Sequence, residues 1–196
     1  MEKILIAAID RAGGIGKDGY MPWHYPADLK LFMNLTMGNT IVMGRKTFDG
    51  MFDRDKLPLK GRQNIIVTSA AAEYKAKFAD KYPTSELTFT TDLHCGDVEL
   101  VKDTKLFYCG GANLYQQVLD LVDLDLIYLS RLEESYDCDT FFPRSSDSTA
   151  LVARFAIDTE FEPYLPKHLE QSFSDKMAGQ KPFTFQIYTP KKLIIY

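Results

Sequence analysis

The sequence predicts an α/β fold, in which residues 1–196 form a single domain around a central, mostly parallel sheet of eight strands flanked by helices. Three observations lead to this prediction. Short, fully apolar runs recur along the chain, as in strands that are buried on both faces of a parallel sheet. Segments of helical composition separate these runs, with glycine or proline at the turns. The length of 196 residues is usual for one domain.

The first part of the chain alternates strand and helix. The first strand is expected at residues 4–9, an unbroken apolar run. A glycine-rich loop follows. A helix then begins at Pro26 or Ala27, because proline fits a first helical turn, where its missing N–H would have no partner in any case. This helix ends near Thr36, and residues 40–43 form a second strand that leads into a short helix.

The rest of the chain continues this pattern. Residues 70–81 and 112–122 have helical composition, and the second segment carries apolar residues at helical spacing. The remaining strands are expected at residues 64–69, 87–90, 105–109, 126–132, 151–159 and 183–189. No strong helix pattern separates the last two, so they are expected to form an antiparallel border with the C-terminal strand at the edge.

Two C-terminal segments are expected to lie outside the regular fold. Prolines and glycine interrupt residues 162–181, which are expected to form an elaborated surface loop, with a short helix at residues 165–177 as an alternative. Residues 191–196 form a C-terminal extension, whose apolar end either extends the last strand or meets another subunit.

Composition argues against several classes of function. Hydrophobic residues make up 45% and charged residues 26% of the chain, which is typical of soluble globular proteins. The net charge of −4 gives no general attraction to nucleic acid. The N-terminal apolar run is too short for a signal peptide or a membrane span. The three cysteines lack C-x-x-C spacing, so we expect reduced thiols in a cytoplasmic protein, with no metal, membrane or nucleic-acid partner.

Asp28 is the first candidate functional residue. Helical spacing places it on one face with Leu31, Phe32 and Leu35. A carboxylate in such a position is costly to bury without a partner. Asp28 is therefore either an acid in the first turn that interacts well with the helix dipole, or a buried acid that binds a ligand carrying hydrogen-bond donors.

Two strand-to-helix turns are candidate phosphate sites. Gly110 and Gly111 open a helix, where free backbone N–H groups suit a diphosphate, although plain turns use this pair too and the full G-x-G-x-x-G fingerprint is missing. Arg45 and Lys46 begin another helix, where they oppose the dipole unless an anion lies between them. Two residues that flank the next strand are weaker candidates of this kind: Arg62 and Ser69.

Seven short motifs occur in the order found in dihydrofolate reductases, which the chain resembles. They are Ile-Gly, Met-Pro-Trp, Pro-Ala-Asp-Leu, Met-Gly-Arg-Lys-Thr, Pro-Leu-Lys-Gly-Arg-Gln-Asn, Gly-Gly-Ala-x-x-Tyr and Asp-Thr-Phe-Phe-Pro. The resemblance covers residues 3–143 and resumes at residues 183–188. It implies a dihydrofolate-reductase-like fold and an NADPH-dependent oxidoreductase that acts on a CH–NH group and reduces 7,8-dihydrofolate to 5,6,7,8-tetrahydrofolate.

The resemblance also implies a biological setting. The product would support one-carbon metabolism and the synthesis of thymidylate, purines and glycine. Antifolate inhibitors would bind the same pocket as dihydrofolate, and the usual state in this family is a monomer.

The resemblance implies roles for residues near the substrate. Asp28 matches the acid that binds the pterin and assists protonation of N5 while a hydride passes to C6, and burial is expected to raise its pKa. Trp23 matches a tryptophan that supports a water there, and Ser130 the hydroxyl partner of the acid. Tyr115 matches a tyrosine beside the nicotinamide, and Arg62 an arginine that pairs with the substrate's glutamate. The other matched substrate-binding positions are Ile6, Ala7, Leu29, Phe32, Met51, Leu59 and Cys109.

For the cofactor, the resemblance implies a mobile loop over residues 15–23, carrying Met21, that closes over the nicotinamide. Asp139 is either an anchor for this loop, at Gly16, or a plain turn acid. A cis peptide bond is expected between Gly110 and Gly111. The other matched cofactor-binding positions are Ala8, Ile15, Gly16, Gly44, Arg45, Lys46, Thr47, Thr68, Ser69, Ala112, Asn113 and Leu114.

Two positions depart from the family pattern. Asn113 and Ala70 stand where other members carry basic residues near the 2′-phosphate of NADPH. This pocket is therefore expected to depend on Arg45 and Ser69, which makes the preference for NADPH over NADH the first property to test.

Two rival functions come from other reactions or classes. Related reductases act on a ribosylated pyrimidine of riboflavin synthesis, but they lack an acid equivalent to Asp28 in its Pro-Ala-Asp-Leu context. The other rival is a non-catalytic nucleotide-binding or regulatory protein. Such a protein would not need its catalytic positions, whereas every catalytic position that the resemblance implies is filled in this sequence.

Overall fold

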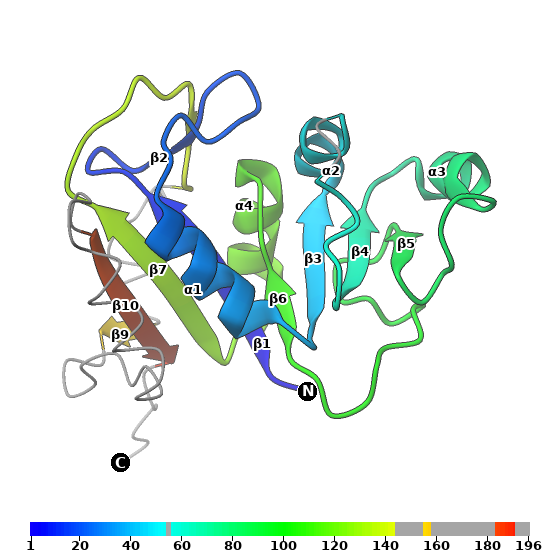
Figure 1. Ribbon diagram of the computed structural model, residues 1–196. Helices are drawn as coiled ribbons and strands as arrows, with labels where there is room; N and C mark the ends of the chain where they lie inside the picture. The colour runs from blue at the N-terminus through cyan, green and yellow to red at the C-terminus, as the bar shows by residue number, and fades with distance from the viewer. Residues whose placement is uncertain (54–55, 144–154, 158–182, 191–196) are drawn as a thin grey trace, which may run out of the picture.

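The computed structural model describes residues 1–53, 56–143, 155–157 and 183–190. Within these residues, eight strands form one sheet in the order β5-β4-β3-β6-β1-β7-β10-β9 (Figure 1). The strands are β1 (Lys3–Ile9), β3 (Thr40–Gly44), β4 (Gln63–Val67), β5 (Leu87–Thr90), β6 (Leu106–Tyr108), β7 (Leu126–Leu132), β9 (Phe155–Ile157) and β10 (Phe183–Pro190). The helices are α1 (Pro26–Thr36), α2 (Arg45–Phe52), α3 (Ala71–Phe78) and α4 (Ala112–Leu121).

The predicted α/β class and its mostly parallel sheet are confirmed. Every neighbouring pair from β5 to β7 is parallel, whereas β10 is antiparallel to both β7 and β9. The expected antiparallel border therefore exists, but the C-terminal strand lies one position inside it and β9 forms the edge. The physical reason is ladder length: β10 pairs with β7 from Phe183 to Tyr188, whereas its ladder with β9 has three pairs among the described residues, and short strands suit edges.

A second, two-stranded sheet lies where the sequence predicted only a glycine-rich loop. β2 (Gly14–Gly16) pairs antiparallel with β8 (Thr140–Phe141). A side chain at Gly14 would overlap the sulfur of Cys138, so only glycine permits this close approach. The pairing depends on a contact between segments far apart in the sequence, which local pattern does not reveal.

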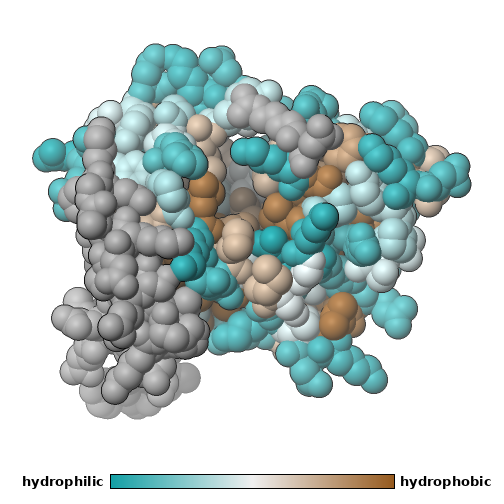
Figure 2. All heavy atoms as spheres, viewed as in Figure 1, coloured by the Kyte–Doolittle hydropathy of each residue, from teal (hydrophilic) through white to brown (hydrophobic). Residues whose placement is uncertain are grey.

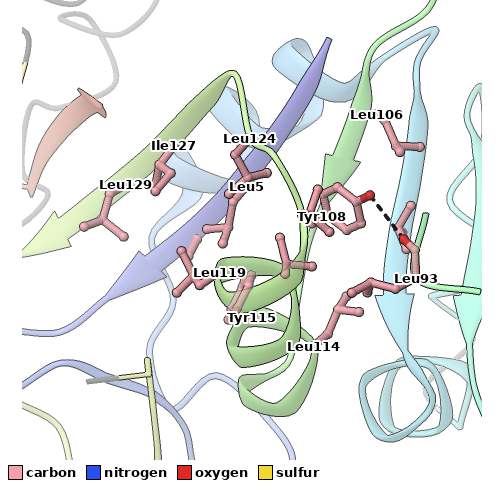
Figure 3. Packing of buried hydrophobic residues seen from close by; sticks show 14 of the residues in the cluster. Leu5, Leu93, Leu106, Tyr108, Leu114, Tyr115, Leu119, Leu124, Ile127 and Leu129 are labelled. Carbon is pink, nitrogen blue, oxygen red and sulfur yellow. Dashed lines mark hydrogen bonds between the residues drawn. The ribbon is translucent and has the colours of Figure 1, made fainter. Parts of the chain in front are cut away.

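The sheet is buried on both faces by helices, and the alternation of β1 shows how. Leu5 and Ile9 belong to the cluster that includes Leu114 and Val118 of α4. Figure 3 shows Leu5 of β1 and Leu114 of α4 in this cluster. On the opposite face, Ile4 belongs to a second cluster, against which side chains of α1 pack and to which α2 and α3 contribute. This arrangement leaves the carboxyl ends of the parallel strands, where ligands bind in such sheets, between α1, α2 and α4.

Several expectations have no structural counterpart to compare. The predicted surface loop at residues 162–181 and the extension at residues 191–196 lie outside the described residues. In the part of the chain that the structure describes, no helix is long and apolar enough to cross a membrane.

Candidate active site

The surface is hollowed between α1 and α2, above the carboxyl ends of the central strands (Figures 1 and 2). Figure 2 shows hydrophobic residues along both sides of this hollow. β1, β3 and β6 all end at this edge, because neighbouring parallel strands run in one direction. Part of the predicted site lies on these strand ends and on α2 and α4, which follow β3 and β6. The rest comes from α1, from β7 and from the loops after β1, before β4 and after β4.

Asp28 lies in the first turn of α1 and is only 8% exposed. The hydroxyl of Ser130, on β7, donates a hydrogen bond to its Oδ1 at 2.5 Å. Burial raises the pKa of Asp28, and the hydrogen bond from Ser130 offsets part of that rise. Of the two interpretations left open by the sequence, the structure therefore favours the buried acid, with the expected partner in contact.

Trp23 lies beside this pair, in a buried cluster with Ala27 and with the half-buried Ala8. Ala8 of β1 pairs with Ser130 of β7, so the cluster borders the acid. The indole N–H of Trp23 is buried and has no hydrogen-bond partner among the described residues. Because buried indole N–H groups normally have partners, this donor is suited to a ligand or an ordered water.

The predicted apolar wall is half-buried and packs against one cluster. Phe32, Met51, Leu59 and Cys109 all contact the hydrophobic cluster that contains Ile6. Leu29 of α1 is 38% exposed and lies at the outer rim. Ala7 is different, because its side chain belongs to the cluster under α4 on the other face of the sheet. Only the backbone of Ala7 is therefore available to a ligand in the hollow.

Arg62 lies at the far end of α1 from Asp28. Its Nη1 donates to the hydroxyl of Thr36 at 3.0 Å, and its Nε donates to the carbonyl of Lys60 at 3.2 Å. Asp28 and Thr36 are eight residues apart on one helix, which corresponds to a separation of about 12 Å along the axis. The groove thus has a buried acid at one end and a guanidinium at the other.

Two helix N-termini meet at the Gly110–Gly111 turn. The N-caps of α2 and α4 are Gly44 and Gly111, and neither helix has a side-chain capping bond. The N–H of Gly44 donates to the carbonyl of Gly110 at 2.7 Å. A Cβ at Gly111 would lie 3.0 Å from the hydroxyl of Thr47. Two uncapped helix ends this close present backbone donors and positive potential to an anion, which is the arrangement that a diphosphate needs.

The Gly110–Gly111 peptide bond is cis, as expected from the resemblance. Gly110 has φ +107, and a Cβ there would lie 3.1 Å from the hydroxyl of Tyr115. Tyr115 is buried, and its hydroxyl donates to the carbonyl of Ile6 at 2.8 Å. Burial keeps the pKa of Tyr115 well above its ordinary value, so the hydroxyl stays protonated and holds this turn against β1.

The basic side chains at this edge come mainly from α2. Arg45 forms an ion pair with Asp49 one turn later, with 2.9 Å between Nη1 and Oδ2. The hydroxyl of Tyr74, on α3, donates to the same carboxylate at 3.0 Å. The sequence analysis did not identify Asp49 or Tyr74, because their contact joins two helices. Of the remaining predicted residues in this region, Lys46 and Ser69 are exposed, Thr68 is buried and Ala112 is half-buried.

Asn113, which departs from the family pattern, is hydrogen-bonded to a neighbour on its own helix. It is exposed on α4, and the side-chain amide of Gln117, one turn later, donates to its side-chain oxygen. Leu114, by contrast, is buried in the core beneath the turn. Asn113 is uncharged, so it supplies no cation for the 2′-phosphate of a cofactor. The predicted cations at this edge are therefore Arg45 and Lys46, at the start of α2.

The loop after β1 is anchored to the segment around β8. The N–H of Asp139 donates to the carbonyl of Gly16 at 3.0 Å, and its carboxylate accepts from the N–H of Asp18 at 2.8 Å. The bond from Asp18, followed by one from the hydroxyl of Thr140, lowers the pKa of the Asp139 carboxyl. The bond to Gly16 confirms the anchor rather than the plain turn acid. Ile15 is half-buried against the core, whereas Met21 is 49% exposed at the loop's other end.

Asp10 is a buried carboxylate that the sequence analysis missed. It is 1% exposed; its Oδ1 accepts from the N–H groups of Ala12 and Gly14, and its Oδ2 accepts from the N–H of Tyr136. In the sequence, the indication that Asp10 is buried was its place directly after the apolar run of the first strand. Among the described residues, no group of three or more histidine, cysteine or acidic side chains is arranged to hold a metal ion.

Comparison with known proteins gives one consistent family. A family model described as dihydrofolate reductase matches residues 3–174. The dihydrofolate reductase of Bacillus subtilis is 35% identical over 143 residues, which cover 73% of this chain and 76% of that protein. The type 3 dihydrofolate reductase of Salmonella typhimurium is 33% identical over 139 residues, which cover 71% of this chain and 76% of that protein.

Longer relatives match in part. The bifunctional dihydrofolate reductase-thymidylate synthase of Daucus carota is 31% identical over 153 residues, which cover 74% of this chain and 29% of that protein. The chain thus spans less than a third of the length of such bifunctional relatives. A solved dihydrofolate reductase from Enterococcus faecalis, complexed with NADP(H) and RAB-propyl, has a TM-score of 0.65 and 23% identity and covers 97% of both chains, which shows a shared fold.

Proposed function

The chain belongs to the dihydrofolate reductase family, and on that premise we propose that it reduces 7,8-dihydrofolate to 5,6,7,8-tetrahydrofolate with NADPH. The observation that carries the proposal is the groove along α1. It holds a buried acid, Asp28, at one end and the guanidinium of Arg62 at the other. Dihydrofolate has the matching chemistry, because its pterin ring carries hydrogen-bond donors and its glutamate carries carboxylates.

The turn between β6 and α4 fits the diphosphate of NADPH. Gly44, Gly110 and Gly111 leave no side chain in the way, and the two uncapped helix ends supply backbone donors. When bound, NADPH supplies the hydride for C6 of the pterin. The contribution of the protein is to orient the two rings and to exclude water, with Tyr115 and the loop around Ile15 bordering the nicotinamide.

Asp28 is proposed to orient the pterin and assist protonation of N5. In its ionised form Asp28 is proposed to accept from N3 and the 2-amino group of the substrate, mainly through Oδ2, because Oδ1 already accepts from Ser130. Because burial raises the pKa of Asp28, the residue keeps its proton to a higher pH than an exposed carboxyl. The indole N–H of Trp23 is proposed to hold the water that passes the proton on toward N5.

The decisive experiment is the loss of NADPH absorbance when dihydrofolate is added to the purified protein. Turnover supports the proposal. Activity on the ribosylated pyrimidine but not on dihydrofolate would support the riboflavin-pathway reaction instead. Calorimetry that shows tight NADPH binding without turnover of any pterin would support a regulatory nucleotide-binding protein.

Arg62→Leu is expected to raise the KM for dihydrofolate by about 10- to 100-fold with little change in kcat, because a charge-assisted bond to the substrate carboxylate contributes roughly 1.5–3 kcal/mol. Steady-state kinetics measure this. Arg131→Leu, which removes an exposed arginine from β7, is the matched control. A dihydropterin without the glutamate should be insensitive to the change at Arg62, and equal losses with both substrates would contradict the assigned role.

Arg45→Leu is expected to raise the KM for NADPH by about tenfold and to leave the KM for NADH nearly unchanged, because only NADPH carries the 2′-phosphate. The carboxylate of Asp49 orients this guanidinium through an ion pair, and the hydroxyl of Tyr74 donates to the same carboxylate. Initial rates with each cofactor at saturating dihydrofolate provide the measurement and its internal control. A parallel loss with both cofactors would show that Arg45 acts elsewhere.

Further properties follow as proposals from the same assignment. The product would serve one-carbon metabolism, and antifolates would compete with dihydrofolate for the groove. Cys95, Cys109 and Cys138 are free thiols, which supports a reducing cytoplasmic setting. A single domain acting as a monomer is proposed from the family's usual state.

A further inference from the structure

Tyr136 packs directly against Trp23. The two ring centroids are 5.3 Å apart with an interplanar angle of 52°, and Tyr136 borders the buried cluster that contains Trp23, Tyr25 and Ala27. An aromatic neighbour at this distance stabilises one orientation of the indole ring. The orientation matters because the indole N–H is the buried donor that has no partner among the described residues.

The backbone of Tyr136 is fixed from the end of β1. Its N–H donates to Oδ2 of Asp10 at 2.8 Å, and Oδ1 of the same carboxylate accepts from Gly14 at 2.6 Å. Asp10 is thus bonded to the segment after β7 and to the loop that leads toward Trp23. A buried carboxylate that accepts several backbone N–H bonds holds its donors in one geometry.

The hydroxyl of Tyr136 reaches the helix that carries Asp28. It donates to a carboxylate oxygen of Glu134 at 3.1 Å and is hydrogen-bonded to the hydroxyl of Tyr25 at 3.2 Å. Tyr25 is the N-cap residue of α1, and its carbonyl accepts from the N–H of Leu29. Asp28 lies in that same first turn. One side chain therefore contacts both elements that present the donor and the acid.

We propose that Tyr136 is a positioning residue, which holds the indole of Trp23 and the N-cap of α1 in the relative geometry in which Asp28 acts. Its ring supports Trp23, its hydroxyl bonds to Tyr25, and Asp10 fixes its backbone. The inference rests on the proposed function, since it assigns Trp23 and Asp28 a shared task. It adds a residue that follows β7 in sequence and acts through Trp23 and Tyr25.

Trp23 is the single tryptophan of the chain, so its fluorescence reports on its own surroundings. Tyr136→Leu, which removes the ring, is expected to shift the emission to longer wavelength and to increase quenching by acrylamide. The same variant is expected to lower kcat for dihydrofolate by about tenfold with the KM for NADPH unchanged, because small displacements of reacting groups are costly. Tyr136→Phe keeps the ring and should restore the emission and most of kcat.

Tyr82→Leu is the matched control, because Tyr82 is a half-buried tyrosine that contacts Phe52 and Phe78. It should change neither the emission nor kcat. If Tyr136→Leu does not fold, as judged by circular dichroism, Tyr136→Met keeps side-chain volume without a ring and replaces it. Unchanged emission with unchanged kcat, or a loss of kcat no larger than in Tyr82→Leu, would overturn the positioning role.

The fluorescence measurement needs no turnover, so the two proposals fail separately. A wild-type protein that does not reduce dihydrofolate would remove the proposed function. An emission spectrum unaffected by Tyr136→Leu would remove the positioning role alone.

Discussion

Asp28→Asn is expected to lower the rate of dihydrofolate reduction at neutral pH by about 10²- to 10⁴-fold, the usual contribution of a positioned acid or base. Asparagine keeps the shape of the side chain and still accepts the hydrogen bond from Ser130, but it holds no titratable proton. Single-turnover hydride transfer at saturating NADPH is the measurement. Binding of NADPH, followed by quenching of Trp23 fluorescence, should be retained, since the proposed diphosphate site uses the backbone donors of the α2 and α4 ends and not the Asp28 carboxyl.

The pH dependence gives an independent test of the same residue. Burial raises the pKa of Asp28, so the wild-type rate should fall as the pH rises through that raised value, where the acid loses its proton. Ser130→Ala removes the bond that lowers this pKa, and the fall should then occur at higher pH. If the rate of Ser130→Ala falls at the same pH as that of the wild-type protein, the assignment of Asp28 as the titrating group is contradicted.

The same burial predicts a cost in stability. The unfolded chain loses the proton of Asp28 near the ordinary carboxyl pKa, whereas the folded protein loses it at the raised value. Between the two the folded state binds more protons, so the free energy of unfolding falls as the pH rises and stays lower above both. Asparagine does not ionise, so Asp28→Asn should raise the Tm of the ligand-free protein at neutral pH while it lowers activity.

Much of the site was predictable because its residues lie in short contiguous motifs. Asp28 follows its helix start directly, and the Gly110–Gly111 turn joins a strand to a helix in immediate succession. Such local patterns determine which groups lie at the ends of strands and helices. The Asp28–Ser130 contact joins positions 102 residues apart, and the resemblance, rather than any local pattern, pointed to it.

The parts that were missed are contacts between separate elements of the chain. Asp10 bonds to Tyr136 across 126 residues, and β2 pairs with β8 only because Gly14 admits Cys138. Neither Tyr136 nor Cys138 lies in a segment whose apolar residues repeat with the period of a helix or a strand. The sequence therefore did not indicate that either side chain packs against the site. The position of β10 inside the edge is a similar case, since it follows from comparing two ladders rather than from either strand alone.

Gly110→Ala is expected to destabilise the protein by about 2–4 kcal/mol and to weaken NADPH binding together with stability. Gly110 has φ +107, a region that L side chains rarely adopt, so alanine is strained there whatever the space. In addition, its Cβ would lie 3.1 Å from the hydroxyl oxygen of Tyr115. That oxygen cannot retreat freely, because Tyr115 is buried and its hydroxyl is bonded to the carbonyl of Ile6.

A control at Gly38 separates strain from contact. Gly38 also has positive φ, at +74, but a Cβ there meets nothing within 4 Å. Gly38→Ala should therefore cost only the backbone term, about 1 kcal/mol, and leave NADPH affinity intact. Thermal melts and NADPH titrations of both variants measure the difference. The two variants could instead lose equal stability and both keep their NADPH affinity. That result would mean that the contact between Gly110 and Tyr115 does not hold the cofactor turn in place. The uncapped ends of α2 and α4 would then be brought together by packing elsewhere.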